Sequence, residues 1–164
     1  MISKVMQAAI NEQINKEMFS SYLYLSMAAY FEAENLPGFG NWLRIQAEEE
    51  NEHAMKFYNH LLERGGKVEL KAIAAPKTSW GSAMEAVSEV LTHEQHVTKS
   101  IHDLYEVALQ EKDYAAQVML HWFIAEQVEE EANASAILDN MKRIEAHDTA
   151  ILMLDHRLGK RKED

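Results

Sequence analysis

Residues 64–82 read RGGKVELKAIAAPKTSWGS and separate two long stretches that have a helical apolar period. Gly65 and Gly66 stand where glycine commonly follows a helix C-terminus. Ser82 and Glu85 form a capping box that opens the next helix. The fifteen-residue linker 67–81 reaches about 50 Å at roughly 3.3 Å per residue, whereas a helix of some 27 residues is about 40 Å long. The linker can therefore cross the whole length of a bundle, which makes the helices on its two sides parallel.

Short breaks divide the remaining chain into helical hairpins. Residues 35–38 (NLPG) and 112–113 (KD) are brief interruptions, so the helices that they join are antiparallel neighbours. The pattern predicts helices over residues of about 3–34, 38–64, 82–111, 114–143 and 149–158. It indicates a single all-α domain over residues 1–164, a four-helix bundle with one long crossover and a short C-terminal fifth helix.

Composition narrows the class of partner. The 164 residues include no Cys, six Gly and two Pro, and 16 basic against 27 acidic residues give a net charge of −11. Disulfides and thiolate metal sites are excluded, and nucleic acid and anionic membranes are poor partners for such a surface, whereas cations suit it. The N-terminus lacks the pattern of a signal peptide and no apolar run could span a membrane, so we expect a cytoplasmic protein.

Each long helix carries one glutamate on its apolar stripe. A lone inward glutamate usually reaches the surface or pairs with a lysine, but no Lys or Arg stands nearby on these stripes. Buried unpaired carboxylates cost several kcal/mol each unless they are protonated or neutralised by cations. Four negative charges balance two divalent ions, which suggests a dinuclear metal site. The four glutamates are Glu17, Glu50, Glu94 and Glu130.

Spacing within the helices supports this interpretation. Glu50 and His53 form a Glu-x-x-His step, which is the recurring ligand pair of di-iron carboxylate bundles. Glu17 and Glu50 are 33 positions apart, and so are Glu94 and Gln127, so Gln127 and Glu130 take the place of a second such step. Because an amide coordinates weakly, we expect two metal positions of unequal affinity, which suits a site that binds, oxidises and releases metal. Carboxylates with one imidazole favour Fe, Mn or Zn over Cu, and iron is the redox candidate.

Together with Tyr24, these residues resemble the site of a prokaryotic non-haem ferritin of the bacterial ferritin A type, and the resemblance covers essentially the whole chain. It implies a ferritin-like fold and a ferroxidase that oxidises Fe(II) with O₂ or H₂O₂ at an intra-subunit di-iron centre. Fe(III) would be stored as mineral in a hollow homo-oligomeric shell of about 24 subunits, to which the fifth helix contributes.

The resemblance also implies roles for individual residues. Glu17, Glu50 and His53 would hold one iron, and Glu94, Glu130 and a bridging Glu50 the other, with Gln127 near it. Tyr24 would be a hydrogen-bond or electron donor to the centre, although packing alone also explains it. A third iron position would be formed by Glu49, Glu126 and Glu129, although runs of glutamate are usually solvated helix faces.

The sequence departs from the bacterioferritin pattern at two places, and two other functions fit the same residues. Bacterioferritins have a second Glu-x-x-His step and a haem-ligating Met at the place of Asn51, so the resemblance implies no haem here. A non-storage di-metal carboxylate oxidase would use the same ligands without a shell. A non-catalytic adaptor bundle would keep its inward carboxylates partly hydrated.

Overall fold

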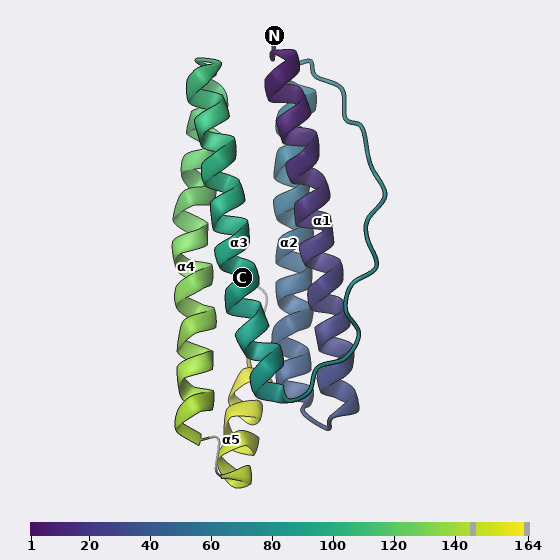
Figure 1. Ribbon diagram of the computed structural model, residues 1–164, viewed down its shortest axis with the longest axis vertical. Helices are drawn as coiled ribbons and strands as arrows, with labels where there is room; N and C mark the ends of the chain where they lie inside the picture. The colour runs from purple at the N-terminus through teal and green to yellow at the C-terminus, as the bar shows by residue number, and fades with distance from the viewer. Residues whose placement is uncertain (145–146, 163–164) are drawn as a thin grey trace.

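Residues 1–144 and 147–162 are described by a computed structural model of the chain. Its helices are α1 (Lys4–Ala33), α2 (Pro37–Glu63), α3 (Ala83–Gln110), α4 (Tyr114–Ile144) and α5 (Asp148–Leu158). The first four form the bundle, and α5 lies across one end of it (Figure 1). The predicted fold class, an all-α bundle with one crossover and a short fifth helix, is confirmed. The predicted domain, 1–164, includes residues 145–146 and 163–164, which lie outside the described part.

The crossover runs along the outer side of α1, from the end of α2 to the start of α3 (Figure 1). Polar side chains on this side of α1 hold its main chain. Asn11 donates to the Lys67 carbonyl at 3.0 Å and accepts from the Glu69 amide at 2.8 Å. Ser26 donates to the Lys77 carbonyl at 2.7 Å. The linker is therefore fixed along the helix, and α3 begins at the same end of the bundle as α2.

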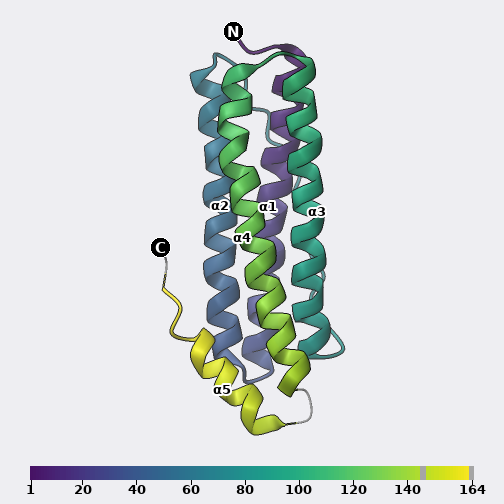
Figure 2. The same cartoon turned by 90° about the vertical axis from the view of Figure 1, so that its left-hand side faces the viewer.

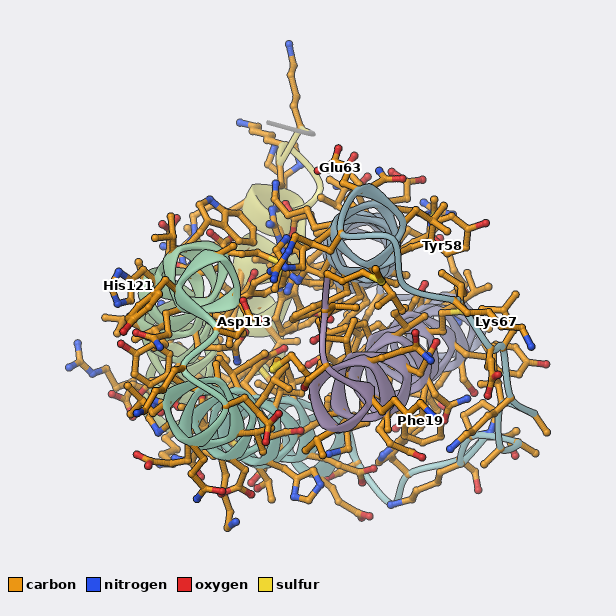
Figure 3. All side chains as sticks on the ribbon, turned by 90° about the horizontal axis from the view of Figure 1, so that it is seen from above. Phe19, Tyr58, Glu63, Lys67, Asp113 and His121 are labelled. Atoms are coloured by element: carbon orange, nitrogen blue, oxygen red, sulfur yellow. The ribbon has the colours of Figure 1, made fainter. Side chains whose placement is uncertain are left out.

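Local sequence explains where α3 and α4 begin. The Ser82 hydroxyl accepts from the Glu85 amide at 3.1 Å, as a capping residue does. The Asp113 carboxylate accepts from the Ala116 amide at 3.0 Å and so caps α4. Seen along the bundle, Asp113 lies at the α3–α4 turn, and His121 points away from the outer side of α4 (Figure 3).

Two buried apolar clusters fill the interior on either side of a polar layer. One cluster includes Phe31 and Phe39 and extends to α5. The other includes Ile10 and Phe57 and lies toward the opposite end. On α1, Glu17 falls between residues of these two clusters. The layer between the clusters is where the inward glutamates lie.

α5 is docked on the N-terminal end of α2. The Asp155 carboxylate accepts from the Phe39 amide at 3.0 Å, which satisfies one of the unpaired amides at that helix end. Leu154 and Leu158 are buried against the first cluster, whereas Leu152 and Met153 are exposed. α5 thus covers one end of the bundle (Figure 2). One of its faces packs on the first cluster, and another presents apolar side chains to the surface.

A methyl group at Gly38 is expected to disrupt this docking. A Cβ atom there would lie 1.7 Å from the Asp155 carbonyl oxygen, which is backbone and cannot move aside. Gly38→Ala should therefore destabilise the protein by about 3 kcal/mol, at the upper end of the cost of overpacking, as measured by thermal unfolding. Gly159→Ala is the matched control, because its nearest contact would be an ordinary 3.5 Å. Equal unfolding midpoints for the two variants would contradict this account of the docking.

Candidate metal centre

The first hairpin brings three predicted ligands together. Glu17 on α1 and Glu50 and His53 on α2 each offer one ligand atom, and these atoms lie within 4.8 Å of one another. All three side chains are buried. The His53 Nδ1 atom is 3.6 Å from Glu50 Oε2. The imidazole ring packs edge-on against Phe123 of α4, which fixes its orientation.

The second hairpin contributes two more buried carboxylates, which are already hydrogen-bonded. Glu94 of α3 accepts from the Tyr24 hydroxyl through Oε1 and from the Gln127 amide through Oε2 at 3.1 Å. Glu130 of α4 accepts from the Gln46 amide at 2.8 Å. The Gln127 amide group therefore acts as a donor that orients Glu94. The Tyr24 hydroxyl does the same from the first hairpin.

Glu50 differs from the other inward glutamates in its hydrogen bonding. Among the described buried side chains, the polar atoms without a hydrogen-bond partner are both Glu50 carboxylate oxygens and Glu17 Oε2. Glu17 Oε1 accepts from the Gln13 amide at 2.7 Å. Buried carboxylate oxygens without partners are costly. A proton shared with Glu17 can satisfy Glu50 while the site is empty. Once that proton leaves, both Glu50 oxygens can accept cations, which is the arrangement that a bridging ligand needs.

The carboxylates strongly oppose one another's ionisation. Burial, reinforced by the charge of Glu50, raises the pKa of Glu17 well above its ordinary value. Burial and the charge of Glu94 do the same to the pKa of Glu50. The pKa of Glu94 is also raised by burial, and burial together with Glu94 raises the pKa of Glu130 to about 7. The site therefore holds protons when it is empty and can exchange them for cations.

Tyr24 remains a neutral donor. Its side chain is fully buried, and burial, with the charge of Glu94, raises the pKa of its hydroxyl well above the ordinary value. A proton therefore stays on the oxygen that faces Glu94. The contact supports the hydrogen-bonding role expected from the sequence.

A chain of hydrogen bonds leads from the surface to Glu17. Lys16 donates to the Ser100 hydroxyl at 2.7 Å, and Ser100 donates to Gln13 Oε1 at 2.7 Å. The Gln13 amide then donates to Glu17. Sequence analysis did not identify Gln13, although it stands four residues before Glu17 on the same helix face. Gln46, four residues before Glu50, was missed as well, and it contacts Glu130 on another helix rather than Glu50.

Removal of the Gln13 amide is expected to weaken metal binding at the position next to it. Gln13→Leu keeps similar bulk but leaves Glu17 without its donor, which should lower the affinity for Zn²⁺ about tenfold, as changes to groups that orient ligands typically do. Isothermal titration measures the change. Gln95→Leu, at an exposed position of α3, is the control and should bind as the unaltered protein does. An unchanged affinity in Gln13→Leu would show that the donor does not orient Glu17.

The three residues expected at a third iron position are only partly brought together. Glu49 and Glu126 line a pocket of about 160 Å³ that reaches His53. Glu129 is exposed on α4 and does not line this pocket. Both Glu49 oxygens accept hydrogen bonds from Arg161, at 2.8 Å each. Arg161 was not identified from the sequence, because its position beside α2 depends on the path of the chain after α5.

Carboxylates from all four helices of a crossover bundle, together with an imidazole from a Glu-x-x-His step, define the class of carboxylate bundle proteins that bind metals between two helical hairpins. Within that class the family is clear from comparison with known proteins. Residues 7–144 match the ferritin-like domain of the Ferritin family. The chain belongs to this family.

Relatives cover the chain from end to end. The bacterial non-heme ferritin of Bacteroides fragilis strain 638R is 45% identical over 161 residues, which covers 98% of this chain and 100% of the relative. The bacterial non-heme ferritin of Staphylococcus aureus strain MRSA252 is 40% identical over 164 residues, which cover 100% of this chain and 99% of the relative. The chain is thus similar to bacterial non-haem ferritins, as the sequence analysis expected.

Solved structures agree with this assignment. An Archaeoglobus fulgidus ferritin engineered into a closed form has a TM-score of 0.99, 48% identity and full coverage of both chains. The open-pore ferritin of the same organism has a TM-score of 0.98 and covers 99% of this chain.

Among the described residues, no helix is both long and apolar enough to cross a lipid bilayer.

Proposed function

We propose that this chain is one ferritin-like domain that takes up Fe(II), oxidises it at a two-metal centre within the subunit and stores the Fe(III) as mineral. The chain belongs to the Ferritin family and is similar to bacterial non-haem ferritins, and ferritins store iron and act as ferroxidases. One observation carries the proposal of the two-metal centre. Glu50 lies buried beside Glu17 and His53, close enough to Glu94 for their charges to interact, and the only hydrogen bond open to its oxygens among the described residues is a proton shared with the Glu17 carboxylate.

The hydrogen-bond pattern supports a division of the ligands. Glu17 and His53 would hold one iron, Glu94 and Glu130 the other, and Glu50 would bridge them. Two divalent cations would balance the charge of the four glutamates, which removes the cost of burying them. The two positions differ because one has an imidazole and the other has only carboxylates with Gln127 beside them. Such inequality favours passage of iron through the centre.

The proposed reaction balances with iron as the substrate. Two Fe(II) ions supply two electrons, enough to reduce O₂ to H₂O₂, with uptake of two protons, or H₂O₂ to two waters. The hydrogen bonds from Gln13, Gln46 and Gln127 keep the carboxylates in place while the charge of the metals rises. Fe(III) hydrolyses to an insoluble oxyhydroxide and releases protons, and protons that return to the raised-pKa carboxylates favour its departure to the mineral. Haem has no part in this proposal.

Iron reaches the centre through the acidic pocket beside His53. Glu48, Glu49, Glu52 and Glu126 line this pocket, and their charges attract cations. We extend the proposal to a third iron position at this entrance, formed by Glu49 and Glu126 and completed by Glu129, which lies outside the pocket three residues further along α4. The shell would be a homo-oligomer of about 24 subunits, and the exposed Leu152 and Met153 of α5 would be covered within it.

Iron loading tests storage. Fe(II) is added under air in large excess over two per chain, and the products are separated by gel filtration with iron detection. A ferritin should carry the iron in a very large particle. Iron that elutes with monomers or dimers would leave a di-metal oxidase without storage. No faster oxidation than in buffer would leave an adaptor bundle.

A further inference from the structure

The segment that follows α5 returns beside α2 (Figure 2) and is fastened there. The Asn41 side-chain amide donates to the carbonyl groups of Leu158 and Arg161, each at 3.2 Å. The Arg161 guanidinium then donates through Nη2 to both carboxylate oxygens of Glu49, each at 2.8 Å. The side chains of Arg161 and Glu49 are 27% and 24% exposed, so the pair is largely withdrawn from water.

Arg161 also contacts the surroundings of the metal centre. Its Nη1 atom donates to Gln46 Oε1, and the Gln46 amide nitrogen donates to Glu130 at 2.8 Å. The guanidinium therefore lies one side chain away from a proposed iron ligand. No such link was expected for a residue in the charged tail of the sequence.

Glu49 is the residue through which Arg161 can influence metal binding. It follows Glu48 on α2 and lines the acidic pocket together with Glu126 and His53. Its charge contributes to the raised pKa of both Glu50 and Glu130, which places it within electrostatic range of the centre. A cation in this pocket would therefore compete with Arg161 for the Glu49 carboxylate.

We propose that Arg161 is a positioning residue that holds Glu49 and thereby restrains metal binding at the entrance to the centre. A cation at the third position must displace the guanidinium from Glu49 or share that carboxylate with it. Partly exposed ion pairs are weak enough for this displacement, and a divalent ion carries twice the charge of the guanidinium. The inference deepens the proposed function, because it rests on the third iron position placed at Glu49.

Titration of the assembled protein with Zn²⁺ alone tests the proposal without redox chemistry. Arg161→Ala is expected to bind a third equivalent roughly fivefold more tightly than the unaltered protein, because the cation no longer has to break an ion pair of modest strength. The first two equivalents should be unchanged. Arg161→Lys should fall between the two, because an ammonium keeps the charge beside Glu49 but lacks the second nitrogen with which the guanidinium also donates to Gln46. Arg157→Ala, at an exposed position of α5, is the control for loss of a positive charge.

Each outcome bears on one claim. If Arg161→Ala and the unaltered protein bind the third equivalent equally, the restraint does not exist. Loss of the third equivalent in Arg161→Ala also overturns the proposal, because Arg161 would then support the site. Arg161→Ala is also made in the Glu49→Gln background. If the double variant binds the third equivalent more tightly than Glu49→Gln alone does, the gain does not pass through Glu49, and the proposal fails. If no variant, and not the unaltered protein either, binds the first two equivalents of Zn²⁺, the two-metal centre itself is refuted. If Arg161→Ala misfolds, Arg161→Lys takes its place in the comparison.

Discussion

Glu50→Gln is expected to slow Fe(II) oxidation by roughly 100-fold or more, since loss of a ligand shared by two metals should cost at least as much as loss of a group that only orients a ligand. The same substitution should raise the unfolding midpoint of the metal-free protein. The reason is that the Glu50 carboxylate is buried with both oxygens unpartnered and is opposed by the charges of Glu94 and Glu130. Stopped-flow absorbance of the ferric product and calorimetry measure the two effects.

The control for this prediction is Glu63→Gln, an exposed glutamate at the end of the same helix. It removes the same charge and should leave both the oxidation rate and the midpoint almost unaltered. Rapid oxidation by Glu50→Gln would show that iron is oxidised elsewhere on the molecule. A lower unfolding midpoint for metal-free Glu50→Gln would show that the Glu50 carboxylate does not destabilise the metal-free protein.

Metal removal should reverse the pH dependence of stability. In the metal-free protein the raised pKa values mean that the folded state holds more protons than the unfolded chain. Stability therefore falls as the pH rises from the ordinary value of 4.5 through the folded pKa, which for Glu130 is about 7. This residue alone accounts for about 3 kcal/mol over that window. Zn²⁺ needs deprotonated ligands, so the loaded protein should become more stable over the same range.

Unfolding midpoints measured at pH 5 and pH 7.5, with and without Zn²⁺, test the reversal. Glu130→Gln should remove part of the fall in the metal-free protein, because its side chain no longer titrates. Parallel pH profiles for the metal-free and loaded proteins would contradict the account. Such profiles would mean that the inward carboxylates do not exchange protons for metal.

Much of the fold and the burial of the four inward glutamates could be predicted from the sequence, for reasons of geometry. Linker 67–81 is long enough to cross the whole bundle, and a glutamate on an apolar stripe shares the core-facing side of its helix. The residues that orient the ligands escaped prediction for a different reason. Gln13 and Gln46 each precede an inward glutamate by four residues, yet Gln13 contacts its neighbour on α1 and Gln46 contacts Glu130 on α4. Which of these happens is decided by the packing between helices.

Arg161 lay even further from prediction. Nothing in a charged tail indicates that its side chain will reach Glu49 on α2. That contact depends on the docking of α5 through Asp155 and on the hydrogen bonds from Asn41. Sequence patterns describe single helices well, whereas the surroundings of the centre arise from contacts between segments distant in the chain.

The crossover has an electrostatic consequence. Because it makes α2 and α3 parallel, helices in contact, such as α1 with α3, run in opposite directions, and their macrodipoles cancel across the bundle. The inward glutamates also lie near the middle of their helices, several turns from any terminus, where that field has faded. The charges of neighbouring side chains, such as Glu49 and Glu94, therefore act on the centre more strongly than the helix dipoles do. Single substitutions can retune it while the backbone stays as it is.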